Sequence, residues 1–119
     1  MYNDSNVVVV KSKAFAIRIV RLYRYLREDK REFVLSTQVL RSGTSIGANV
    51  KEAIRAQSRA DFIAKMHIAL KEASETEYWL ELLEATDYIT ETQAKSILAD
   101  CVELLKLLTS ITKTSQGKD

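Results

Sequence analysis

Proline is absent from the sequence, and glycine occurs only three times in 119 residues. These two residues disfavour a helix interior more than any others, so their scarcity favours a chain that is mostly helical. Apolar residues make up 46% of the chain and charged residues 29%, which are ordinary values for a globular protein and argue against disorder. A chain of this length supports one hydrophobic core, and we expect a single domain over residues 1–119.

Cysteine and histidine each occur once, as Cys101 and His67. A single cysteine excludes an intramolecular disulfide, and no set of cysteine and histidine has the spacing of a zinc site. A di-metal helical bundle needs a Glu-x-x-His pair on each of two helices, whereas Ala64 stands three residues before His67. We therefore expect no metal and no cofactor. Cys101 is expected to be a small buried core residue, and His67 to lie at the surface or at an interface.

Long apolar runs are also missing. The longest one, residues 7–10, is far shorter than the roughly 20 apolar residues of a membrane-spanning helix. The N-terminus lacks the basic and then apolar pattern of a secretory signal. We expect a cytoplasmic protein with no membrane partner. Whether residues 7–10 extend the first helix or pack against a neighbouring subunit stays open.

Groups that take part in catalysis are present but not in the arrangements that catalysis needs. Residues 41–49 are rich in hydroxyls, yet no His and Asp pair accompanies them, and the Gly-Lys-Ser/Thr of a phosphate loop is missing. The carboxylates of residues 72–84 scatter around one predicted helix and are expected to be solvated. We expect no catalytic residues and no enzymatic activity.

Apolar residues recur at spacings of three and four in four segments, which predict helices at about residues 11–29, 36–56, 59–86 and 91–113. Links of only a few residues force consecutive helices to run antiparallel. The expected fold is therefore all-α, an antiparallel up-and-down four-helix bundle. Two capping boxes mark helix starts, Ser58 with Asp61 and Thr90 with Gln93. The first turn should fall near residues 30–34, and residues 114–119 are expected to fray.

The second predicted helix has polar and small residues on its core side. Ser42 and Asn49 share the stripe of Val39 and Ile46, so both should find hydrogen-bond partners in the core. Two glycines four residues apart each cost about 1 kcal/mol relative to alanine in a helix. We expect these glycines to allow the close approach of a neighbouring helix: Gly43 and Gly47.

The third and fourth predicted helices carry more apolar residues than one core-facing stripe needs. On the third helix, Ile68, Trp79 and Leu82 lie more than a right angle away from the stripe. The fourth helix adds four apolar residues around its own stripe: Leu98, Val102, Leu105 and Leu107. A solitary bundle would expose this surface to water, so we expect a homo-oligomer with Ile68, Trp79 and Leu82 in its interface.

Charge is divided unevenly along the chain. Residues 1–57 hold 11 basic and 5 acidic side chains, whereas residues 58–119 hold 7 and 11. Basic residues on the first two helices are predicted to face away from the core, where they could neutralise phosphates of RNA or another nucleic acid. The candidate residues are Arg18, Arg21, Arg24, Arg41, Lys51 and Arg55.

Three other interpretations of this charge pattern stay open. The basic face can be merely solvated, or the basic half of one subunit can pair with the acidic half of its neighbour. The chain can also be an oligomeric scaffold that contacts a protein partner and binds no nucleic acid.

One group of segments covers nearly the whole chain and includes a specific second-helix motif. It consists of residues 15–23, 40–49, 52–53, 61–63, 69–73, 75–76 and 78–80, and of Cys101, Leu104 and residues 108–110. In these segments the chain resembles the bacterial four helix bundle protein family, which includes the intervening-sequence proteins of 23S ribosomal RNA.

This resemblance implies an up-and-down bundle that assembles into a ring, expected to be a pentamer. It also implies a similarity to the accessory proteins of diversity-generating retroelements, which are basic pentamers that work with a reverse transcriptase and nucleic acid. The shared motif residues are expected to have structural rather than catalytic roles.

Overall fold

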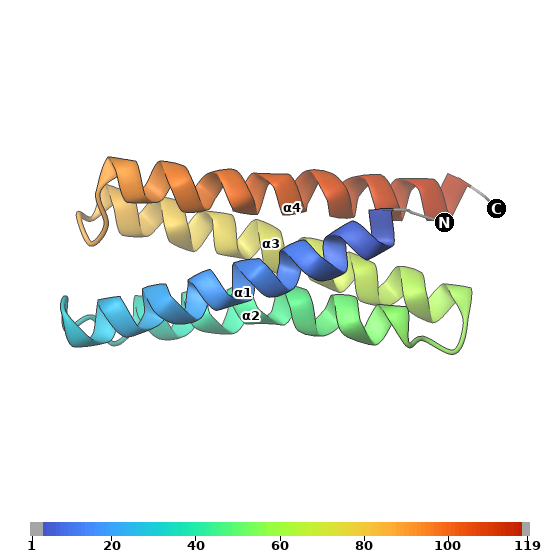
Figure 1. The fold of residues 1–119 in the computed structure, drawn as a ribbon, viewed down its shortest axis with the longest axis horizontal. Helices are drawn as coiled ribbons and strands as arrows, with labels where there is room; N and C mark the ends of the chain where they lie inside the picture. The colour runs from blue at the N-terminus through green and yellow to red at the C-terminus, as the bar shows by residue number, and fades with distance from the viewer. Residues whose placement is uncertain (1–3, 118–119) are drawn as a thin grey trace.

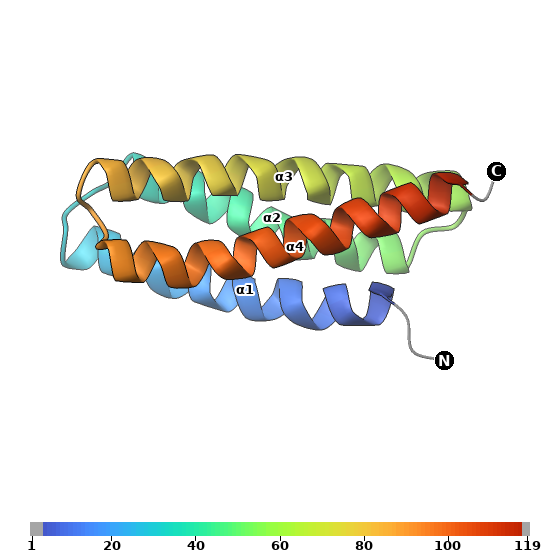
Figure 2. The same cartoon turned by 90° about the horizontal axis from the view of Figure 1, so that it is seen from above.

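A computed structural model describes residues 4–117, with side chains over residues 6–115. Four helices follow one another: α1 (Asp4–Glu28), α2 (Leu35–Ile54), α3 (Arg59–Ala85) and α4 (Glu91–Gly117). Consecutive helices run in opposite directions, and the views in Figure 1 and Figure 2 show them side by side in an elongated bundle of 47 × 22 × 21 Å. The predicted all-α, up-and-down four-helix bundle is confirmed.

Each helix packs against the next one along the chain, and α1 also packs against α4. The contact between α1 and α4 is the least extensive of the four. In the view of Figure 1, α1 crosses the bundle obliquely and separates from α4 towards its C-terminal end, while ion pairs join the two helices at Lys11 with Glu103 and at Arg18 with Asp100.

Local hydrogen bonds begin α3 and α4 where the capping boxes predicted. The Ser58 Oγ accepts a hydrogen bond from the Asp61 backbone N–H at 3.1 Å. The Gln93 N–H donates to Thr90 Oγ1 at 3.1 Å, and the Thr90 N–H donates to Gln93 Oε1 at 2.9 Å. Both halves of a capping box are thus present at α4. The link at residues 29–34 also falls where expected.

Two predicted helix ends were wrong. α1 begins at Asp4 rather than near residue 11, because Val8 lies on the same face as Phe15 and is buried. Residues 7–10 therefore extend the first helix. α4 continues to Gly117 instead of fraying from residue 114, since Ile111 and Thr112 are buried in its last turns. Residues 118–119 of the predicted tail lie outside the described part.

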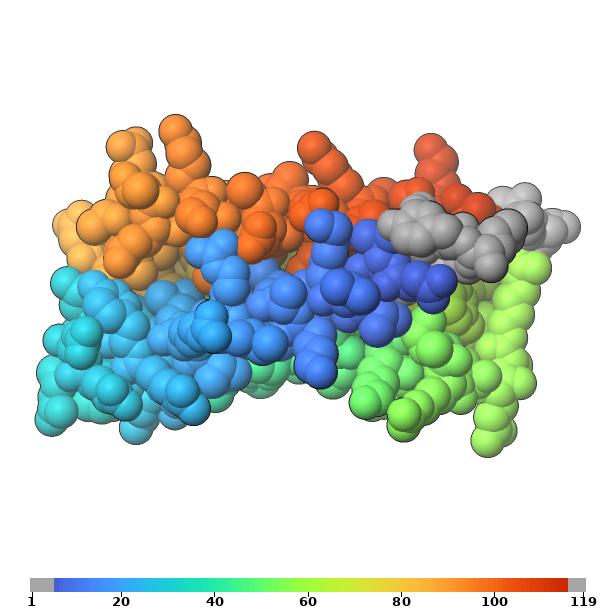
Figure 3. All heavy atoms as spheres, in the orientation of Figure 1, coloured from blue at the N-terminus to red at the C-terminus, as the bar shows by residue number. Residues whose placement is uncertain are grey.

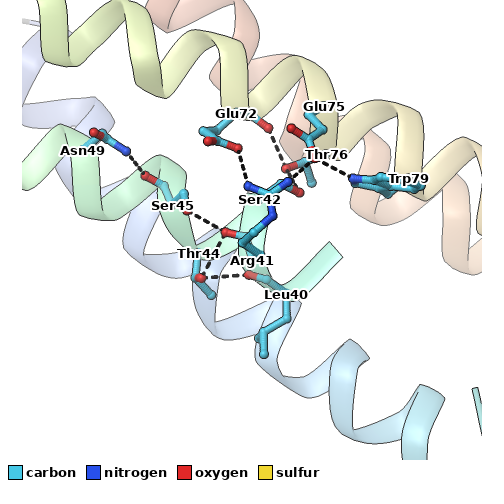
Figure 4. Close-up of polar contacts among 10 residues, drawn as sticks. All are labelled: Leu40, Arg41, Ser42, Thr44, Ser45, Asn49, Glu72, Glu75, Thr76 and Trp79. Atoms are coloured by element: carbon cyan, nitrogen blue, oxygen red, sulfur yellow. Dashed lines mark hydrogen bonds and ion pairs between the residues drawn. The ribbon is translucent and has the colours of Figure 1, made fainter. Parts of the chain in front are cut away.

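The predicted stripes form the core. On α4 the stripe is buried along its whole length: Ile97, Cys101, Leu104, Leu108 and Ile111. Of the two polar residues expected in the core, Ser42 is buried and lies 2.9 Å from the Thr76 hydroxyl on α3. Asn49 is half-buried and donates to the Ser45 carbonyl of its own helix at 2.9 Å. Figure 4 shows both contacts on the side of α2 that faces α3.

α1 packs closely against α2 at the two glycines, through the Ile19 side chain at Gly43 and the Ser12 backbone at Gly47. A Cβ atom on Gly43 would stand 2.8 Å from both Cγ atoms of Ile19, which is closer than atoms in van der Waals contact. A Cβ on Gly47 would stand 3.4 Å from the Ser12 carbonyl oxygen. Gly43 leaves no room for a methyl group beside Ile19, whereas Gly47 has nearly enough room for one.

The exposed apolar surface lies only partly where the sequence predicted it, since Ile68 on α3 is exposed but the predicted residues of α4 are not. On α4, Leu98, Val102, Leu105 and Leu107 are half-buried, because α4 is flanked by both α3 and α1. In the described part of the chain, the large apolar side chains that are exposed come from α1, the α1–α2 link, the end of α2 and α3. They are Val9, Val10, Ile17, Phe33, Val34, Ile54, Ile68 and Tyr78.

Candidate nucleic-acid interface

Arg18 does not share the outer face of α1 with Arg21 and Arg24, contrary to the prediction. It points to α4, where Nη1 lies 2.8 Å from Asp100 Oδ2. The same guanidinium donates to the Ser96 carbonyl at 3.3 Å and to Ser96 Oγ at 3.1 Å. Its hydrogen bonds therefore connect α1 to α4, and its charge is compensated.

Arg41 on α2 is also held by acidic side chains. Its guanidinium forms ion pairs with Glu72, at 3.3 Å, and with Glu75, both on α3 (Figure 4). Glu75 additionally accepts a hydrogen bond from the Trp79 indole N–H at 3.0 Å. Because two carboxylates face one guanidinium, this part of α2 and α3 carries no positive excess.

The other four predicted residues are exposed, but they form two separate pairs. Arg21 and Arg24 lie in the second half of α1, whereas Lys51 and Arg55 lie at the end of α2 and line a hollow of about 530 Å³ between α1 and α2. Since Gly43 packs against Ile19, a rise of 1.5 Å per residue separates the two pairs by about 20 Å along the bundle. The six predicted residues therefore do not make one surface.

A denser basic cluster surrounds the end of α1. Residues 21–31 contain five basic and two acidic side chains. The five basic residues are Arg21, Arg24, Arg27, Lys30 and Arg31, which we call the basic end. In Figure 1 it occupies the end of the bundle where α1 passes into α2.

Aromatic rings lie among the cations of the basic end. The Arg27 guanidinium carbon stands 4.9 Å from the centre of the Phe33 ring and 5.3 Å from that of Tyr23. Arg31 lies 5.5 Å from the Phe33 ring centre, and the Lys30 ammonium lies 5.9 Å from that of Tyr25. These are cation–π distances. Phe33 nevertheless keeps 46% of its surface exposed, so the cluster presents both charge and an aromatic ring.

The backbone of this link is fixed by its own hydrogen bonds. Arg31 has a φ of 55°, in the left-handed region that ends many helices, and the Glu32 N–H donates to the Leu26 carbonyl at 2.9 Å. The buried Glu32 carboxylate then accepts from the N–H groups of Leu35 and Ser36, at 3.0 and 2.7 Å, at the start of α2. Glu32 is therefore engaged at a helix N-terminus and is not directed at the basic end.

A groove of about 500 Å³ lies next to the basic end, between α1 and α4. It occurs where the two helices diverge, and Figure 3 shows this face of the molecule, with α1 below α4. Its lining combines aliphatic side chains with polar ones: Arg18, Arg21, Leu22, Tyr25, Ile89, Thr92, Gln93, Ser96 and Ile97. The groove and the basic end share Arg21, and they meet through Tyr25 and Lys30.

Cys101 is buried in the core, as predicted, where Sγ lies 3.4 Å from the Ala73 carbonyl. Burial away from water, followed by the charges of Glu77 and Glu81, raises the pKa of this thiol from 9.0 to about 12. The thiolate is therefore disfavoured at neutral pH, which does not suit a nucleophile.

Within residues 4–117, no three side chains of His, Cys, Asp or Glu are grouped so that they could hold a metal ion. None of the helices in this part combines the length and apolar character needed to cross a membrane.

The three residues predicted at an oligomer interface differ in their surroundings. Ile68 is 40% exposed on α3, and Leu82 is half-buried. Trp79 packs against the core and donates its indole N–H to Glu75. Of the three, Ile68 presents the most open apolar surface to a partner.

The basic end was not among the candidate sites that the sequence predicted. Arg27, Lys30 and Arg31 were visible as a cluster of basic residues at the end of a helix, a position that the helix dipole alone favours. The signal that could have found the site is the alternation of these cations with Tyr23, Tyr25 and Phe33.

The fold is that of a small all-α protein whose four helices form a compact bundle. Residues 4–110 match the family model described as 23S rRNA-intervening sequence protein, and the chain belongs to this family. No curated protein matches the sequence.

A crystal structure of a Bacteroides thetaiotaomicron protein of unknown function from the S23 ribosomal protein family is similar to this chain. The two share 62% sequence identity with a TM-score of 0.92, over 93% of this chain and 99% of the other. This similarity establishes the fold independently of the helical periodicity.

Proposed function

We propose that this protein is a non-enzymatic helical protein that assembles with copies of itself and binds RNA, or another nucleic acid, through the basic end. The observation that carries the proposal is that three of the five cations of the basic end, Arg27, Lys30 and Arg31, stand against aromatic rings, of which Phe33 is exposed. Phosphate binding is driven by such cations, since each neutralised phosphate releases condensed counterions. Aromatic rings beside them add stacking surface for bases.

Because Arg18 and Arg41 form ion pairs within the protein, they are less suited to binding phosphate than exposed basic residues. A guanidinium that already faces a carboxylate must lose that partner before it can bind a phosphate, which reduces the gain. Arg21 and Arg24 remain suited to phosphate contact, and Lys51 with Arg55 forms a second, smaller patch. Arg27, Lys30 and Arg31 replace Arg18 and Arg41 in the proposed site.

Assembly is part of the proposal. Exposed apolar side chains on α1 and α3, such as Ile17 and Ile68, favour association with further copies of the chain. The resemblance to retroelement accessory proteins suggests a ring of five, which would repeat the basic end around an axis. The family description names 23S rRNA, which makes an RNA the first ligand to test. Light scattering coupled to size exclusion measures the subunit number.

The function is tested by fluorescence polarisation with a labelled structured RNA at two salt concentrations. The wild-type protein is compared with a variant that carries Arg21→Glu, Arg24→Glu and Lys30→Glu, three exposed positions of the basic end. For about three phosphate contacts, a roughly fourfold rise in salt should weaken wild-type binding by roughly 20- to 40-fold. The variant should bind far more weakly at both salt concentrations. Wild-type protein that shows no salt-sensitive binding would rule out the function.

A second candidate is an oligomeric scaffold that contacts a protein partner and no nucleic acid. It is favoured by the apolar residues on the outer side of α1, of which Val10 is 69% and Ile17 45% exposed. A partner protein that co-purifies with the chain after nuclease treatment, and is lost in an Ile17→Glu variant, would support the scaffold.

A further inference from the structure

We infer that the α1–α4 groove receives an unpaired base of a single-stranded nucleic acid while the basic end holds the neighbouring phosphates. The inference rests on the proposed function and goes beyond it by naming the form of nucleic acid. The observations behind this inference are the position of the groove next to the basic end and the side chains that line the groove.

The groove has the size and the lining of a site for a small organic group. Its volume of about 500 Å³ falls in the range of ligand pockets, which are mainly apolar with a few polar groups. Leu22, Ile89 and Ile97 supply aliphatic surface, and Thr92 and Ser96 supply hydroxyls that can pair with the edge of a base. An unpaired base offers both an apolar face and a hydrogen-bonding edge.

Arg21 and Tyr25 connect the groove to the basic end. Tyr25 lines the groove, and the Lys30 ammonium stands 5.9 Å from its ring centre. A base that stacks on Tyr25 therefore brings its sugar and phosphate near Lys30 on one side and Arg21 on the other. Lysine is a flexible point charge that can move from a ring to a phosphate. Base and phosphate contacts would thus be made by adjoining residues.

Both walls of the groove carry a side chain that is held in place before any ligand arrives. Arg18 is held by Asp100 and by Ser96, and Gln93 closes the cap at the start of α4. Neither wall has to be ordered on binding, which lowers the entropic cost. A base that is stacked and paired inside a duplex cannot enter such a recess. The groove therefore selects single strands or loops over continuous duplex.

The inference is tested by blocking the groove without changing charge. Thr92 is exposed at the groove, and Thr109 is exposed at the far end of the same helix. Thr92→Trp fills the recess, and Thr109→Trp is the matched control. The probes are a labelled unstructured RNA and a labelled hairpin of equal length and charge that consists almost entirely of paired bases.

Wild-type protein and Thr109→Trp should bind the unstructured RNA better than the hairpin, and Thr92→Trp should lose about tenfold in affinity for the unstructured RNA alone. A Tyr25→Leu variant, which keeps an apolar side chain but removes the ring, should show the same selective loss, with circular dichroism to confirm its helix content. Equal binding of both probes, unaffected by Thr92→Trp, overturns the inference and leaves the proposed function standing. Failure of wild-type protein to bind either RNA overturns both.

Discussion

Arg18 and Asp100 join the first and the last helix of the bundle, with Arg18 Nη1 lying 2.8 Å from Asp100 Oδ2. A second ion pair, Lys11 with Glu103 at 3.1 Å, connects the same two helices nearer the start of α1. Both pairs lie across the least extensive helix contact of the bundle. Arginines that look equivalent along α1 therefore differ in their contacts, since Arg18 binds α4 while Arg21 is exposed beside the groove.

Replacing each of these two arginines by methionine should separate their roles. Arg21→Met should lower the slope of log affinity against log salt for a structured RNA by about one, because one phosphate contact is lost. Arg18→Met should leave that slope unchanged and lower the free energy of unfolding by at most about 1 kcal/mol, since the ion pair is partly exposed. A larger slope change in Arg18→Met than in Arg21→Met would contradict this assignment.

The two glycines of α2 should respond differently to alanine. Gly43→Ala places a methyl group 2.8 Å from the fully buried Ile19, and overpacking of about 1–3 kcal/mol should outweigh a gain in helix propensity of about 1 kcal/mol. Gly47→Ala should be neutral or stabilising, because its neighbour at 3.4 Å has only to shift slightly. Urea unfolding of both variants measures the difference. Equal effects at the two positions would show that the close packing of α2 against Ile19 of α1 does not depend on a glycine at position 43.

The features of the fold that were predicted correctly depend on residues close together in the chain. The capping boxes at Ser58 and Thr90 involve side chains three residues away, so their sequence determines their geometry. The buried stripe of α4 follows from helical periodicity. The start of α1 was missed because Val8, which continues the buried stripe of α1, lies within the apolar run of residues 7–10, where periodicity is difficult to detect.

The features of the candidate site that were missed depend on where other helices lie. Arg18 falls outside the core stripe of α1, and only the position of α4 shows that it meets Asp100. The α4 side chains Leu98 and Leu105 look surplus on an isolated helix, yet they pack against the core because α3 and α1 flank α4. The basic end depends on the turn at Arg31, which brings Phe33 back towards Arg27.

The cap on α2 gives a third test. Glu32→Ala removes the carboxylate that accepts from the N–H groups of Val34, Leu35 and Ser36, and it should lower the free energy of unfolding by about 1–2 kcal/mol. Glu28→Ala is the matched control, because this exposed residue lies in the last turn of α1, where removing a negative charge costs nothing. If chemical denaturation finds equal losses in the two variants, Glu32 does not act as a cap.

The buried thiol of Cys101 leads to a prediction about how stability depends on pH. Because the folded-state pKa of Cys101, about 12, lies above its ordinary value of 9.0, folding favours the protonated thiol. Its contribution to stability is fully present below pH 9 and is lost as the pH rises towards 12. A thiol reagent at pH 8 should label the native protein far more slowly than the unfolded chain. Since the chain has one cysteine, rapid labelling of native protein would contradict the buried position.

The central claim, that the basic end binds nucleic acid as a local site, is tested most directly by comparing two triple variants with equal charge changes. One reverses Arg21, Arg24 and Lys30 to glutamate, and the other reverses three exposed lysines of α4 to glutamate: Lys95, Lys106 and Lys113. Their affinities for one structured RNA are measured by fluorescence polarisation at one low salt concentration. The basic-end variant should lose at least about tenfold more affinity than the α4 variant, because only the former removes phosphate contacts. Equal losses would show that the RNA responds to net charge alone, and the claim would be wrong.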